Sequence, residues 1–118
     1  MMTHEHAHAL AQRWIDAWNA HDIEAVLALF SDDFSFSSPL IRQLTGEPSA
    51  KLVGKQAVRA YWQRGLAHLP ELHFERVEVL IGTDGLTILY RGHRGLTAEV
   101  LTLRDDGLIQ RGQAFYPT

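Results

Sequence analysis

The sequence predicts an α+β domain in which three helices pack on a strongly curved antiparallel sheet that follows them in the chain. Two observations predict this class. Apolar residues recur at helical spacing over 3–30 and again over 54–69, and four strand-like runs separated by turn residues occupy 72–116. The 118 residues suit a single domain, 1–118, that is large enough to enclose a core and one cavity.

Composition excludes several classes of function. With 46% hydrophobic and 21% charged residues, the chain is expected to fold throughout. The 11 Lys and Arg residues are scattered among 14 Asp and Glu, which argues against a nucleic-acid partner. Cysteine is absent, so thiolate catalysis is excluded. Residues 1–8 lack the pattern of a secretory signal, and no apolar run approaches the ~18 residues of a membrane span. We expect a cytoplasmic protein without a membrane partner.

The first two helices are predicted from capping residues and spacing. Thr3 is a suitable N-cap for a helix whose apolar face includes Trp14 and Trp18. Residues 19–22 break this helix, and Asp22 can cap a second, short helix that ends at Phe30.

The next segment alternates between apolar and polar residues. Phe34 and Phe36 are separated by serines, which is typical of a half-buried strand, and Pro39 stops that strand. Residues 40–53 show no period and are predicted to be a loop at the rim of a pocket. A third helix is expected over 54–69, before Pro70.

The remainder of the chain is predicted to be a meander of antiparallel strands. The turn residues lie at 82–85, 92–95 and 105–107. They separate strand-like runs at 72–81, 86–91, 96–104 and 108–116.

Several motifs give this order a family resemblance. They are Gln-Arg-Trp at 12–14, Asn-Ala-His-Asp at 19–22, Val-Leu-Ala-Leu-Phe-Ser-Asp-Asp at 26–33, Ala-Val-Arg-Ala-Tyr-Trp at 57–62 and Asp-Gly-Leu-Ile at 106–109. The chain resembles the cone-shaped nuclear transport factor 2-like fold over nearly its whole length, and its motifs are similar to those of ketosteroid isomerases and SnoaL-like proteins. The resemblance implies a cavity over a curved sheet. It does not select a reaction, because this superfamily includes isomerases, cyclases and non-catalytic binding proteins.

The resemblance to ketosteroid isomerase also indicates how this chain departs from that enzyme. The family's tyrosine donor on the first helix corresponds to Trp14 here, and its general base before the strand-ending proline corresponds to Ser38. The acid on a late strand is retained as Glu99. An indole N–H is a weaker donor than a phenol, and a serine is no base near pH 7 without a partner. The chain is therefore not expected to be a ketosteroid isomerase with the standard mechanism.

Glu99 is the main candidate for chemistry. Alternation along its strand places it on one face with Thr97 and Leu101. On a buried face its pKa would be raised, so that it would serve as an acid or base near neutrality. The alternative is a solvated Glu99, or one paired with Arg91 or Arg111.

The neighbours of Glu99 depend on two turns. A tight turn near His93 places Tyr90 on the Glu99 face. A three-residue turn at 105–107 adds Gln113 and Phe115, whereas a two-residue turn adds Gly112 and Ala114 instead. The family resemblance favours the three-residue turn.

These residues define the expected site and function. We expect a small apolar molecule in the cavity and proton transfer by Glu99, as in an isomerase or cyclase, with His73 as a candidate general base. Its expected ligand-binding residues are Trp14, Trp18, Phe34, Phe36, Ser38, Tyr61, Tyr90, Gln113 and Phe115. The alternative is a ligand-binding or accessory module without chemistry of its own.

No cofactor and no metal are expected. Neither a nucleotide-binding loop nor a metal-binding histidine pattern occurs on a predicted helix or strand. Both faces of several strands carry apolar residues, which predicts a homodimer through the outer face of the sheet.

Overall fold

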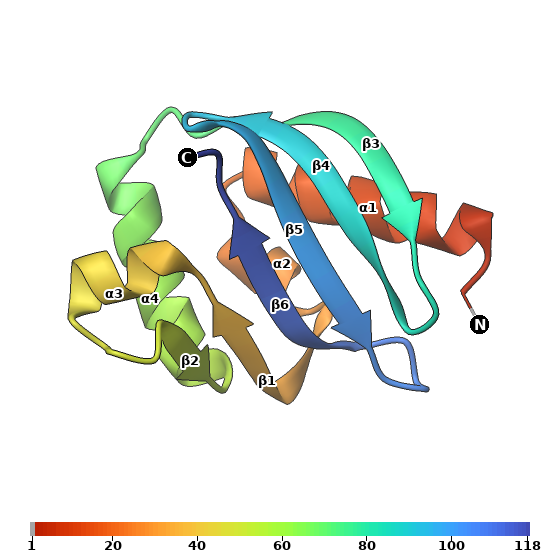
Figure 1. Ribbon diagram of the computed structural model, residues 1–118, viewed down its shortest axis with the longest axis horizontal. Coiled ribbons are helices and arrows are strands. Elements are labelled where there is room, and N and C mark those ends of the chain that lie inside the picture. The colour runs from red at the N-terminus through yellow and green to blue at the C-terminus, as the bar shows by residue number, and fades with distance from the viewer. Residues whose placement is uncertain (1) are drawn as a thin grey trace.

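A computed structural model describes residues 2–118 and shows helices packed on a curved, six-stranded sheet (Figure 1). The elements in chain order are α1 (His4–Asn19), α2 (Ile23–Leu27), β1 (Phe30–Ser37), α3 (Pro39–Thr45), β2 (Lys51–Val53), α4 (Lys55–His68), β3 (Glu75–Ile81), β4 (Gly85–Gly92), β5 (Gly95–Leu103) and β6 (Ile109–Phe115). The strand order is β2-β1-β6-β5-β4-β3. The pair β1–β6 is parallel and the other pairs are antiparallel. The predicted α+β class is confirmed.

Helix α1 lies across the inner face of the sheet, and its end is tied to the first strand of the meander. The Thr3 hydroxyl caps the helix by accepting from the backbone N–H of His6. At the other end, the Asn19 amide donates to the carbonyl of Phe74 at 2.9 Å and accepts from its N–H at 2.7 Å. These two hydrogen bonds hold the backbone of Phe74, directly before β3, against the end of the helix.

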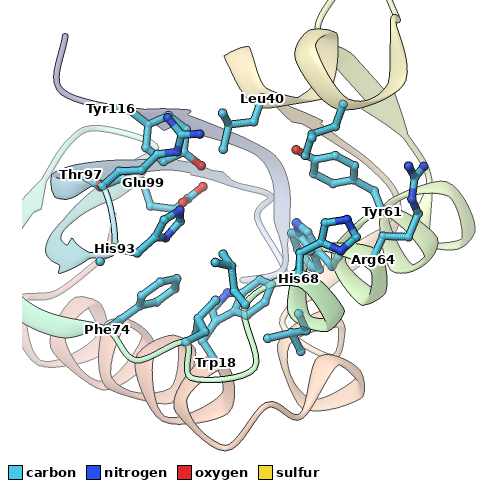
Figure 2. Close-up of a pocket in the computed structure, with 18 of the residues that line it drawn as sticks. Trp18, Leu40, Tyr61, Arg64, His68, Phe74, His93, Thr97, Glu99 and Tyr116 are labelled. Carbon is cyan, nitrogen blue, oxygen red and sulfur yellow. The ribbon is translucent and has the colours of Figure 1, made fainter.

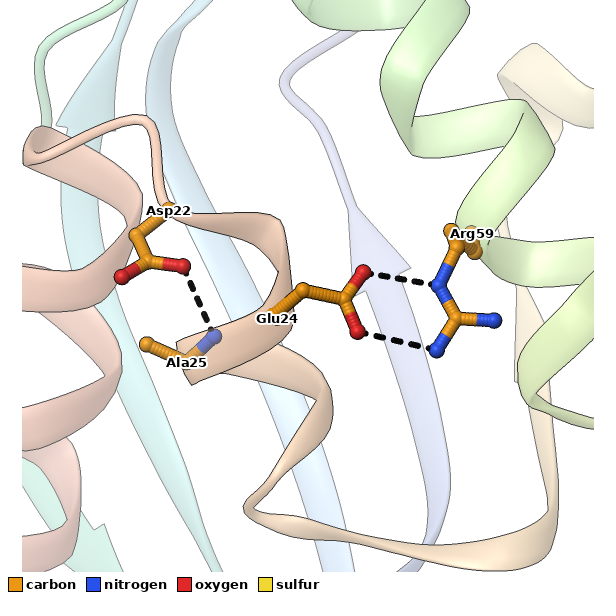
Figure 3. A network of polar contacts seen from close by, with 4 residues as sticks. All are labelled: Asp22, Glu24, Ala25 and Arg59. Carbon is orange, nitrogen blue, oxygen red and sulfur yellow. Dashed lines mark hydrogen bonds and ion pairs between the residues drawn. The ribbon is translucent and has the colours of Figure 1, made fainter.

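Helix α2 is short and is held at both sides by carboxylates (Figure 3). The Asp22 side chain accepts from the backbone N–H of Ala25 at 3.0 Å, so Asp22 is the expected N-cap. The Glu24 carboxylate receives two bonds from the Arg59 guanidinium of α4, at 2.7 and 3.0 Å. The pair joins α2 to α4.

Two boundaries and one segment differ from the sequence predictions. Helix α2 ends at Leu27, and β1 begins at Phe30, whereas the helix was expected to continue to Phe30. Strand β3 begins at Glu75 and not at Leu72.

The predicted loop over 40–53 contains α3 and β2. Ser38 caps α3, Pro39 occupies its first turn, and Gly46 ends it in the left-handed conformation at φ 78°. Proline suits the start of a helix because its missing N–H is not needed there. Interpreting Pro39 only as the end of a strand concealed this helix.

The register of β5 and β6 also differs from expectation, and it decides which residues face the interior. The backbone N–H of Arg104 bonds to Leu108, so the expected three-residue turn is present. A bulge follows it, because Leu103 pairs with Ile109 but Thr102 pairs with Arg111. One extra residue reverses the faces of the strand beyond it.

As a result of this bulge, Ala114 lies opposite Glu99 and Gly112 lies opposite Leu101. The prediction that Gln113 and Phe115 share the Glu99 face is therefore wrong. Phe115 lies on the outer face of the sheet and is 55% exposed.

Aromatic rings fill the space between the helices and the inner sheet face. Trp14 stacks on Phe74 with ring centroids 5.6 Å apart. Trp62 contacts both Trp18, at 5.0 Å, and Phe34, at 6.0 Å. Within residues 2–118, no helix is long and apolar enough to cross a membrane.

Candidate functional site

The aromatic core opens into a cavity of about 290 Å³ between α4, the inner sheet face and the end of α1. This volume is at the small end of the roughly 300–1,000 Å³ found for ligand pockets. Figure 2 shows Trp18 and Phe74 on one wall, with Tyr61 and Glu99 on facing walls. A largely apolar wall with a few convergent polar groups is the usual form of a small-molecule site.

Glu99 is the buried acid of this wall. It is 5% exposed and lies on the inner face of β5. Arg91 and Arg111 are on the outer face, since they pair with Leu96 and Thr102, so neither compensates the Glu99 charge. Burial raises the pKa of Glu99 to about 8. The carboxyl is therefore mainly protonated at pH 7 and can donate a hydrogen bond into the cavity.

Tyr90 supports this carboxyl from the neighbouring strand. Its hydroxyl donates to Oε1 of Glu99 at 3.3 Å, which partly opposes the rise in the Glu99 pKa. Burial and the nearby Glu99 raise the pKa of Tyr90 far above its ordinary value, so it stays a donor. Phe74 and Trp14 pack against its ring, with centroids 4.4 and 5.3 Å away. This packing fixes the direction of the hydroxyl.

A second group of hydroxyls belongs to Ser38, Tyr61 and Tyr116. Ser38 is 3% exposed, and its oxygen accepts from the N–H of Leu40, which caps α3. Burial raises the pKa of Tyr61 and, helped by the charge of Glu99, raises that of Tyr116 to about 12; the Ser38 hydroxyl opposes both shifts. Both phenols are therefore hydrogen-bond donors at neutral pH.

Trp18 offers one further donor. Its ring lines the cavity, and its indole N–H is buried without a hydrogen-bond partner. An unpaired buried donor costs about 1–3 kcal/mol. The nitrogen is fully buried, so a ligand in the cavity would reach it only after the ring moved.

The mouth of the cavity carries basic and ionisable side chains. Arg64 and His68 come from α4, and His93 and Arg94 come from the turn between β4 and β5 (Figure 2). Burial and the charge of Arg94 lower the pKa of His93, which favours the neutral imidazole at pH 7.

The structure brings together only part of the predicted site. Five predicted residues line the cavity: Trp18, Phe36, Tyr61, Tyr90 and Glu99.

The other predicted residues lie elsewhere. Trp14 and Phe34 are buried in the core, and Ser38 lies behind the wall, where it contacts Tyr61 and Tyr116. Gln113 and Phe115 are on the outer sheet face. His73 is exposed ahead of β3 and does not line the cavity, so the structure gives no support to its expected role as a base.

Sequence reasoning missed the residues that surround the mouth. Arg64 and His68 follow the predicted Tyr61 at the three- and four-residue spacing of one helix face, which was an available signal. His93 and Arg94 lie in a predicted turn and are exposed in the structure, and no pattern in the sequence placed them at the cavity. Tyr116 follows the last strand, and no pattern in the sequence placed it near Glu99.

Across residues 2–118, no cluster of three His, Asp or Glu side chains has a geometry that could hold a metal ion.

Comparison with known proteins identifies the family. The model of the SnoaL-like domain matches residues 11–112, and the chain belongs to this family. A crystal structure of a SnoaL-like protein of unknown function from Burkholderia thailandensis is 44% identical, with a TM-score of 0.95 over 98% of each chain.

Two more distant structures share the fold. The epoxide hydrolase/cyclase-like enzyme SalBIII, of pyran ring formation in the polyether salinomycin, is 15% identical with a TM-score of 0.78, covering 100% of this chain and 95% of that one. A candidate ketosteroid isomerase from Kribbella flavida is 23% identical with a TM-score of 0.69, covering 97% of this chain and 79% of that one. The protein therefore has the cone-shaped nuclear transport factor 2-like fold of isomerase- and cyclase-like proteins.

Proposed function

We propose that this protein binds a small, largely apolar molecule in its cavity and catalyses a proton transfer on it, as an isomerase or cyclase. The observation that carries the proposal is Glu99, a buried carboxyl that has no ion-pair partner among residues 2–118 and whose pKa is raised to about 8. A neutral acid in an apolar site can donate to a substrate oxygen as negative charge develops there.

In this mechanism Glu99 is the acid and Tyr90 orients it. Since Tyr90 donates to Oε1, the proton of Glu99 is available on the other oxygen for the substrate.

His93 is the proposed base in place of His73. It lines the cavity on the same side as Glu99, and its lowered pKa leaves the imidazole free to accept a proton at pH 7 (Figure 2). The proton leaves a carbon next to a carbonyl for His93 and returns to a different carbon, while Glu99 stabilises the enolate oxygen between the two steps.

The test is exchange of α-protons in small cyclic ketones in D₂O, followed by proton NMR. Wild-type protein should accelerate exchange, and Glu99→Gln and His93→Gln should each reduce the rate about 100-fold or more, as expected for loss of an acid or base. Exposed Glu71 supplies the control variant Glu71→Gln, which should retain the rate.

The pH profile gives a second readout. His93 must be neutral and Glu99 protonated, so the rate should rise through the lowered His93 pKa and fall through about pH 8. Glu99→Gln should lose the fall at high pH. Equal rates in wild type and Glu99→Gln would contradict the mechanism.

A second candidate function is ligand binding without turnover. It is favoured by Ser38, which caps α3 at the position where ketosteroid isomerases carry their base. Saturable binding of ketones with no exchange above background would select this function.

We also propose that two copies associate through the outer sheet face. Phe115, Leu80 and Leu96 on that face are 55%, 51% and 45% exposed. Large exposed apolar patches mark association surfaces, and two-fold dimers are the commonest oligomers.

A further inference from the structure

The charges around the cavity are unbalanced. Among its lining residues, Arg64 and Arg94 are permanent cations, and Glu99 is the one carboxyl. That carboxyl is mostly neutral at pH 7 because of its burial. The cavity therefore presents a net positive wall, although the whole protein has a net charge of −3.

The two arginines lack carboxylate partners in the part of the chain that the structure describes. The ion pairs there join Lys55 to Asp32, Arg59 to Glu24 and Arg104 to Asp106. Arg94 instead lies against the ring of Tyr116, with its Cζ atom 5.7 Å from the ring centroid. This contact holds the guanidinium on the cavity wall while its charge remains uncompensated.

The influence of Arg94 extends across the mouth. Together with burial, its charge lowers the pKa of His93 beside it. The same charge opposes the rise that burial causes in the pKa values of Tyr116, directly after β6, and of Tyr61 on α4, and Arg64 adds to the effect on Tyr61. An anion in the mouth would thus lie in a positive field and near two phenol donors. Guanidinium groups also match the planar geometry of a carboxylate.

We propose that the ligand of this cavity is an amphipathic carboxylate, with its apolar body among the aromatic rings and its carboxylate at the mouth between Arg64 and Arg94. This rests on the proposed binding function and specifies its ligand class. The neutral state of Glu99 is consistent with it, since an ionised Glu99 would repel such a ligand.

The experiment compares two probes that differ in charge alone. They are 4-cyclohexylbutanoate and its uncharged amide, 4-cyclohexylbutanamide, which has the same apolar body and nearly the same size but exchanges the anionic oxygen for an NH₂ donor. Binding at pH 7 is followed by quenching of Trp18 and Trp62 fluorescence, since both rings line the cavity. The variants are Arg94→Gln and Arg64→Gln. Arg13→Gln is the matched control, because Arg13 is exposed on α1, away from the cavity, and the change in net charge is the same.

The carboxylate should bind wild type about tenfold more tightly than the amide, as a charge-assisted pair at a partly solvated site allows. Added salt should reduce that preference. Arg94→Gln should abolish most of the preference for the carboxylate, and Arg64→Gln should remove a smaller part of it. Arg13→Gln should leave the preference unchanged. Amide affinity should be equal in all four proteins, which shows that the variants are folded.

Two other outcomes would contradict different parts of the account. If the amide binds as tightly as the carboxylate, or if Arg13→Gln loses the preference as fully as Arg94→Gln, the carboxylate inference is overturned and the cavity remains a binding site. If neither probe binds, the binding function itself is contradicted, and this inference with it.

Discussion

Glu99 should make the free energy of unfolding of this protein depend on pH. The folded state keeps the Glu99 proton up to about pH 8, whereas an unperturbed carboxyl releases it near 4.5. The folded state thus binds more protons between these values, and the free energy of unfolding falls as pH rises through that window. The fall is about 1.4 kcal/mol per pH unit within the window.

Glu99→Gln should remove this dependence. The variant should gain stability relative to wild type as pH rises from 5 to 8, by several kcal/mol in total. Urea unfolding at a series of pH values measures it, with Glu71→Gln as the control for an exposed carboxylate. Parallel pH curves for wild type and Glu99→Gln would show that Glu99 is not desolvated.

Tyr90 permits a test of the hydrogen bond itself. Its hydroxyl favours the ionised form of Glu99, so Tyr90→Phe should move the Glu99 pKa above about 8. Carbon-13 NMR of the labelled Glu99 carboxyl measures the midpoint of its titration. A midpoint that falls or stays the same would mean that the 3.3 Å contact does not stabilise the charge.

At the scale of elements, helix α2 depends on one capping residue. Asp22→Ala removes the bond to the N–H of Ala25 and should cost about 1 kcal/mol of stability, whereas Asp22→Asn should cost less because its side-chain oxygen still accepts. The stabilities of wild type and the two variants are compared by thermal unfolding. Equal losses for Ala and Asn would assign the effect to charge and not to capping.

Local patterns predicted most elements but not the bulge in β6. Helical spacing, caps and turn residues identified α1, α4 and the strands other than β2, because each depends on a few neighbouring residues. The bulge before Arg111 depends on how β6 meets both β1 and β5, and no local pattern encodes that. One inserted residue therefore moved Gln113 and Phe115 out of the predicted site, while Tyr90 and Glu99, joined by a tight turn, were placed correctly.

At the scale of the whole molecule, the bulge in β6 places Phe115 on the outer sheet face, where we propose that two copies associate. Phe115→Glu places a charge at this exposed apolar face and should shift the protein from dimer to monomer. Light scattering at micromolar concentration measures the mass, with Glu71→Gln as the control. A monomeric wild-type protein would contradict the proposed association.

Only some of the residues that line the cavity could be predicted from the sequence. Its floor could be predicted, since Glu99 shares a strand face with Thr97 and Leu101. One side of its mouth could not, because Tyr116 and Arg94 meet only after β5 and β6 have paired.

The protonation state of Glu99 is the central claim of this account, and carbon-13 NMR of the glutamate side-chain carboxyls tests it most directly. The resonance that Glu99→Gln removes should titrate with a midpoint of about 8. A midpoint near the ordinary value of 4.5 would contradict the account, because Glu99 would then be an ionised, solvated carboxylate at pH 7.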